Sequence, residues 1–117
     1  MAGTFSVESN KAKKTVTLTF NGFFITDEAE RFAADYSKAV QEVGQSTATL
    51  ILDAANLSIF PQDKVALVIE FYKDYGKFKE IYAVKPKSAT AYMQMQTNLK
   101  EAGILAKVKF VETLPVI

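Results

Sequence analysis

Apolar residues recur with two different periods along the chain, and the changes of period divide it into strands and helices. Val16, Leu18 and Phe20 alternate with threonines, which is the period of a half-buried strand. Other stretches repeat apolar residues every three or four positions, as amphipathic helices do. The pattern predicts five strands, over residues 4–9, 15–20, 49–54, 79–84 and 108–111. It also predicts three helices, over residues 27–43, 62–75 and 89–102.

Glycine, proline and small polar residues mark the predicted ends of these elements. Asn21-Gly22 is expected to break the second strand, and Gly44 to stop the first helix. Pro61 suits the first turn of the second helix, where its missing N–H costs no hydrogen bond. Ser88 is expected to cap the third helix.

The element order is β-β-α-β-α-β-α-β, which predicts a single α/β domain over residues 1–117. Strands that alternate with helices favour a mostly parallel, mixed sheet with right-handed crossovers, and the first two strands form a hairpin. The second and fifth strands each carry one polar side, made of threonines in one and lysines in the other. A doubly wound sheet would bury both faces, so we expect helices mainly on one face.

The composition excludes several kinds of chemistry. The 117 residues include no cysteine and no histidine, which removes thiol chemistry, the commonest general base and the commonest metal ligand. The net charge is +1 and no basic stripe is present, so nucleic-acid binding is unsupported. The longest apolar run, Val65–Ile69, is far shorter than a membrane span. No signal-peptide pattern follows Met1, and the expected location is cytoplasmic.

Asp53 and Asp63 are the two carboxylates expected to converge at the carboxyl ends of the strands, where parallel sheets bind ligands. Such a pair could hold Mg²⁺ or supply an acid and a base. No third ligand, nucleophile or glycine-rich phosphate loop accompanies them, so a helix-capping or loop-ordering role is favoured for both. We expect no enzyme activity, metal or cofactor, and a small-ligand site near Asp53, Asn56 and Asp63 is the third of three functional hypotheses.

The second predicted helix carries more apolar residues than one face requires. At 100° per residue, the residues expected to cover the sheet are Val65, Val68, Ile69, Tyr72 and Tyr75. Leu67 and Phe71 fall outside this face, and the preceding loop adds Ile59 and Phe60. An exposed apolar patch of this kind indicates a binding surface, unless these residues fill the core or cover the edge of the sheet.

The third predicted helix has an uncharged polar face. Its buried face is expected to hold Tyr92, Met95, Leu99 and Ala102. Its solvated face is expected to hold Thr90, Gln94, Thr97 and Asn98, with Met93 as an exposed apolar residue.

Two stretches of the chain resemble the STAS domain, the sulfate transporter and anti-sigma factor antagonist domain. In the first, the apolar strand Leu50–Asp53 is followed by a loop and a helix start at Pro61–Lys64. The second, Leu99–Phe110, is similar to the closing helix, glycine turn and last strand of that family. The order of elements resembles the family over nearly the whole chain, but the Asp-Ser-Ser/Thr-Gly signature is absent.

The resemblance implies a non-catalytic module for protein–protein interaction, regulatory like an anti-sigma factor antagonist. In those antagonists a serine or threonine at this helix start is phosphorylated by a partner kinase, and the added charge blocks docking. The resemblance places Asp63 at that position, where its carboxylate either mimics a permanently modified state or is simply a first-turn acid. The residues that it implies for partner binding are Ser58, Ile59, Phe60, Asp63, Lys64, Leu67 and Phe71.

An alternative hypothesis assigns the same apolar patch to self-association. The chain would then be a structural subunit of a larger assembly, such as a homo-oligomer or a phage particle. The apolar tail Leu114–Ile117 would contribute to the contacts.

Overall fold

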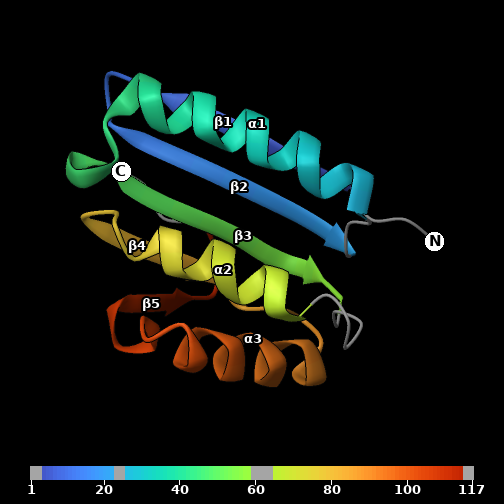
Figure 1. Ribbon diagram of the computed structural model, residues 1–117. Helices are drawn as coiled ribbons and strands as arrows, with labels where there is room; N and C mark the ends of the chain where they lie inside the picture. The colour runs from blue at the N-terminus through green and yellow to red at the C-terminus, as the bar shows by residue number, and fades with distance from the viewer. Residues whose placement is uncertain (1–3, 23–25, 59–64, 115–117) are drawn as a thin grey trace.

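In a computed structural model, the chain is described over residues 4–22, 26–58 and 65–114. The strands within these ranges are β1 (Thr4–Asn10), β2 (Thr15–Gly22), β3 (Thr49–Leu57), β4 (Glu80–Val84) and β5 (Val108–Val111). The α-helices are α1 (Thr26–Val43), α2 (Val65–Tyr75) and α3 (Ala89–Glu101). Two short 3₁₀ turns, Gln45–Thr47 and Leu105–Lys107, lead into β3 and β5. The arrangement is shown in Figure 1.

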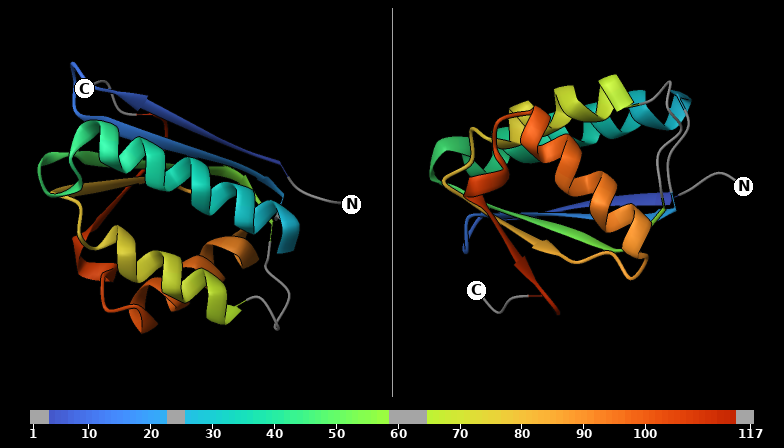
Figure 2. Two further views of the ribbon diagram at one scale, coloured as in Figure 1. Left: turned by 45° about the horizontal axis from the view of Figure 1, so that its top comes forward. Right: turned by 90° about the horizontal axis from the view of Figure 1, so that it is seen from below.

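The five strands lie side by side in the order of the sequence, β1-β2-β3-β4-β5. β1 is antiparallel to β2, and the three remaining pairings are parallel. Each parallel crossover moves one strand along in the same direction, so right-handed connections bring every helix to the same face. Figure 2 shows α1, α2 and α3 together on one side of the sheet. The predicted fold class is confirmed.

The two faces of the sheet differ as the alternation predicts. Leu18, Leu52 and Ala83 occupy one row across the helix-covered face and are fully buried. The other face carries the threonines of β2 together with Tyr82 and Lys109, whose ammonium lies 5.3 Å from the centre of the Tyr82 ring. This face therefore combines polar and amphipathic side chains with the buried apolar residues Ile51 and Val84.

The position of α1 over the sheet is set by Phe32. Its buried ring lies 5.3 Å from that of Phe5 on β1 and 5.6 Å from that of Phe20 on β2. Phe5 and Phe20 are direct cross-strand partners. Because Phe32 contacts both about equally, α1 lies over the β1–β2 pair.

Two strand ends predicted from local sequence are wrong. Asn21-Gly22 does not break β2, which continues through Gly22. β3 continues past Ala54 to Leu57. In both cases the parallel ladder continues beyond a bulge, with Asn21 opposite Asn56, and this pairing outweighs the local preference for a turn.

The predicted helix ends agree with the structure to within one residue where it describes them. Ser88 caps α3, since its Oγ accepts a hydrogen bond of 3.2 Å from the N–H of Ala91. Gly44 and Gly103 follow α1 and α3 with φ of 79° and 80°, the left-handed conformation that favours glycine. Pro61 and the first predicted turn of the second helix, 62–64, lie outside the described residues.

Candidate protein-binding surface

The structure places only part of the predicted partner-binding set. The residues of that set outside the described ranges are Ile59, Phe60, Asp63 and Lys64. Ser58 lies exposed directly after β3, and Leu67 and Phe71 lie on α2. The site can therefore be examined through α2 and its two neighbouring helices.

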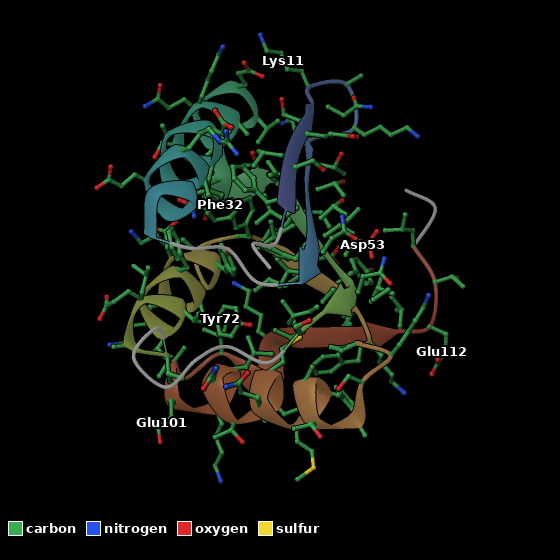
Figure 3. The ribbon with its side chains drawn as sticks, turned by 90° about the vertical axis from the view of Figure 1, so that its right-hand side faces the viewer. Lys11, Phe32, Asp53, Tyr72, Glu101 and Glu112 are labelled. Carbon is green, nitrogen blue, oxygen red and sulfur yellow. The ribbon has the colours of Figure 1, made fainter. Side chains whose placement is uncertain are left out.

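α2 buries Val68, Tyr72 and Tyr75 against the sheet and leaves Leu67 38% exposed. Figure 3 shows Tyr72 directed into the interior between the helices and the sheet. Phe71 was expected on the surface beside Leu67, but it is half-buried. The reason is α1, whose Phe32 ring meets the Phe71 ring edge-on at 5.2 Å. Within the described residues, the predicted patch therefore consists of one exposed leucine with a half-covered phenylalanine below it.

The groove between α1 and α2 has a volume of about 290 Å³ and contains these two side chains. Ala33, Tyr36 and Ser37 of α1 form its opposite wall. Glu70 and Asp74 stand at its rim, each close to a lysine: Lys73 at 3.6 Å and Lys77 at 3.1 Å. The rim is thus balanced in charge around an apolar floor.

A hydrogen-bonded network closes one end of this groove. The Tyr36 hydroxyl donates to Asp74 Oδ2 at 2.6 Å, and Gln45 Nε2 donates to Asp74 Oδ2 at 3.1 Å and to the Asp74 carbonyl at 2.9 Å. Burial alone would raise the pKa of the Asp74 carboxyl, but hydrogen bonds from Tyr36, Lys77 and Gln45 outweigh it and hold that pKa below its usual value. The network fixes the end of α1 to the end of α2.

A second groove, of about 380 Å³, separates α2 from α3. Val65 and Ile69, which were expected to cover the sheet, are only half-buried and line one wall. Asn98 lies on the other wall and is 3% exposed. Within the described chain, its Nδ2 has no hydrogen-bond partner. The prediction that Asn98 is solvated is wrong, because α2 packs along this flank of α3.

The predicted pair of carboxylates does not form a described site. Asp53 lies within β3 rather than at its carboxyl end, and Figure 3 shows it on the side of the sheet away from α1 and α2. Its Oδ1 accepts a 3.4 Å hydrogen bond from the N–H of Ala55, and Asn56 donates to Asn21 at 3.1 Å. Asp63 lies outside the described residues. In the chain as described, no three Asp, Glu, His or Cys side chains gather as a metal site would require.

The helix-covered side of the same strands holds an apolar cavity of about 20 Å³ between β3 and α2. That volume is close to one water molecule, and the lining includes Leu52, Ala54 and Val68.

Among the helices of the described residues, none has the length and apolar content to cross a membrane.

No protein-family model matches the sequence, and no curated protein matches it either. Among solved structures, the chain is similar to the crystal structure of an uncharacterised protein from Shewanella loihica, which belongs to the DUF3478 family and has a SpoIIAA-like fold. The TM-score is 0.65 at 11% sequence identity, over 96% of this chain and 87% of the other. The chain therefore has a SpoIIAA-like fold, the fold of STAS-type anti-sigma factor antagonists.

Proposed function

We propose that this protein is a non-catalytic interaction module that binds another protein through a surface centred on α2. The surface comprises Leu67, Phe71 and Ser58, and extends to the predicted residues Ile59, Phe60, Asp63 and Lys64. A regulatory role like that of an anti-sigma factor antagonist is the function that this fold supports best. Phosphomimicry by Asp63 and the cytoplasmic location stay predictions.

The observation that carries the proposal is the exposure of Leu67 above Phe71 in the groove between α1 and α2. A single exposed leucine is ordinary on a protein surface. Here Leu67 lies beside a groove whose floor contains the Phe71 ring. A partner side chain in this groove could contact both Leu67 and Phe71 and displace water from both. Because lysines balance the rim carboxylates, the partner needs an apolar anchor rather than a particular net charge.

Leu67→Glu tests the proposal, with Met93→Glu as the matched control. Both positions are exposed and helical, at 38% and 67%, so neither change should alter stability by more than about 0.5 kcal/mol. A partner is first identified with the wild-type protein by affinity capture and mass spectrometry. Binding is then measured by calorimetry, where loss of a central anchor is expected to weaken it roughly 30-fold or more.

Met93→Glu should bind as the wild-type protein does, since α3 carries Met93 away from the α2 surface. Equal affinity of the Leu67→Glu variant would reject this docking surface. Loss of binding by both variants would show that an added negative charge weakens binding whatever its position on the helices.

One observation favours the alternative of a structural subunit. Leu114, at the start of the apolar tail, is 51% exposed. That alternative predicts a defined large oligomer of the purified chain in a sedimentation experiment, and truncation after Thr113 should dissolve it. The interaction module predicts no assembly larger than a dimer.

A further inference from the structure

The free edge of the sheet at β1 is open to pairing. β1 pairs with β2 along all seven of its residues without a bulge, and no described segment pairs with its other side. Natural edge strands are commonly protected by lysine, proline, bulges or shortness. β1 has none of these and carries a single charge, Glu8.

The flank of α1 above this edge carries a stripe of alternating charge. Arg31, Asp35, Lys38 and Glu42 are all exposed and fall within about 60° of one another at 100° per residue. The ends of the stripe contact β1: the Arg31 guanidinium lies 5.1 Å from the centre of the Phe5 ring, and Ser9 Oγ donates to Glu42 at 2.6 Å. The stripe therefore lies over the free edge and faces away from α2.

The stripe and the strand have the same centre of symmetry. A two-fold axis through Val7 would pair all of Thr4–Asn10 with itself in antiparallel register. The contacts of Phe5 with Arg31 and of Ser9 with Glu42 align that strand centre with the middle of the stripe. The same axis sets Arg31 opposite Glu42 of a second copy, and Asp35 opposite Lys38 of a second copy. Every charge in the stripe then meets one of opposite sign.

We propose that the chain forms a two-fold symmetric dimer, in which β1 pairs with β1 of a second copy and the two α1 stripes exchange ion pairs. The occupant of the free edge is thus another copy of this chain, and the result is a continuous ten-stranded sheet. Cross-strand pairing would set Ser6 opposite Glu8 of the other copy, and half-buried Val7 against its own equivalent. This surface is separate from α2, so the proposal does not depend on the proposed function.

A charge swap at exposed positions tests the helix contact. Asp35→Lys sets lysine against Lys38 of the other copy, twice per dimer, and should raise the dissociation constant at least about tenfold in sedimentation equilibrium. Adding Lys38→Asp restores opposite charges and should return the constant to within about threefold of wild type. Glu101→Lys makes the same charge change on α3 and should leave it unaltered, as should Leu67→Glu.

Engineered cysteines test the strand register, since the chain contains none of its own. The Ser6→Cys/Glu8→Cys variant should form a covalent dimer on oxidation, because directly opposite residues of paired strands are within disulfide reach. Met93→Cys on α3 should remain uncrosslinked. A wild-type chain that stays monomeric up to about 1 mM would overturn the proposal. The proposal would also be overturned by a dimer whose dissociation constant is unchanged by Asp35→Lys and whose Ser6→Cys/Glu8→Cys variant does not crosslink.

Discussion

The two flanks of α2 differ in how completely their polar groups are satisfied. On the α1 side, Tyr36, Gln45 and Asp74 form a closed network, and aromatic rings meet edge-on beside it. On the α3 side, Asn98 is buried beside a groove of about 380 Å³, and its Nδ2 has no hydrogen-bond partner in the part of the chain that the structure describes. The comparison shows that polar groups are paired on one flank of α2, whereas one buried amide nitrogen on the other flank has no partner among the described residues.

The difference has an energetic meaning. A closed network rigidifies the elements it joins, whereas a buried amide without a partner costs about 1–3 kcal/mol. The buried Nδ2 of Asn98 therefore lowers stability at the α2–α3 flank, whereas the network adds to it at the α1–α2 flank. Each of the following predictions compares two substitutions, one of which serves as the reference for the other.

The largest effect is expected at Phe32 of α1, whose ring meets Phe71 of α2 as well as the rings of the sheet. Its ring is fully buried against those of Phe5, Phe20, Tyr36 and Phe71, so Phe32→Ala should reduce the free energy of unfolding by about 4 kcal/mol. Ile69→Ala on the α3 side of α2 should cost only about 1–2 kcal/mol, since that side chain is half-buried. Urea titration measures both, and equal losses would contradict the difference in burial between the two side chains.

An opposite effect is expected at Asn98. Asn98→Leu removes the unpartnered amide, and the groove beside it can accept the larger side chain, so the variant should be more stable by about 1 kcal/mol or more. Thr97→Leu makes a similar gain in helix propensity at an exposed neighbour without touching that amide. Thermal unfolding of the two variants separates the contributions. A destabilised Asn98→Leu protein would show that the amide has a partner in solution.

The smallest effect is expected from the charge of Asp74. Its pKa is lower in the folded protein than the unfolded value of about 3.9, so the stabilisation is complete above that pH and is lost as the pH falls through the folded pKa. About a third of the side chain is exposed, so we expect only about 1 kcal/mol. Unfolding of Asp74→Asn between pH 6 and pH 2.5 should show a shallower acid loss than wild type.

Glu101→Gln is the reference for that measurement, because Glu101 is an exposed acid at the end of α3. It should follow the wild-type acid profile. Identical acid-unfolding profiles for Asp74→Asn and wild type would show that the charge of Asp74 does not contribute to the loss of stability in acid.

Residues whose role is local could be predicted from the sequence. Alternating threonines on β2 and lysines on β5 predict one open sheet face, and the cap at Ser88 depends on residues three positions apart. Both features need only the period of a strand or the geometry of a helix end.

Residues whose role depends on a distant neighbour could not be predicted. Helical spacing gives Asn98 a place on α3 but does not reveal that α2 lies against it. Phe71 is covered by Phe32 from another helix, and Tyr36 meets Asp74 across 38 positions of sequence. At Asn21 the ladder with β3 outweighs a strong local turn signal. In each case tertiary contacts override the pattern.

The sequential strand order has a consequence for how the molecule is made. Every strand pairs with the one synthesised just before it, so no strand must be inserted between two that have already formed. Each step then closes a loop no longer than one helical crossover, and the sheet can grow outward from its N-terminal hairpin as the chain leaves the ribosome. The last strand to arrive, β5, has only four residues and completes the far edge.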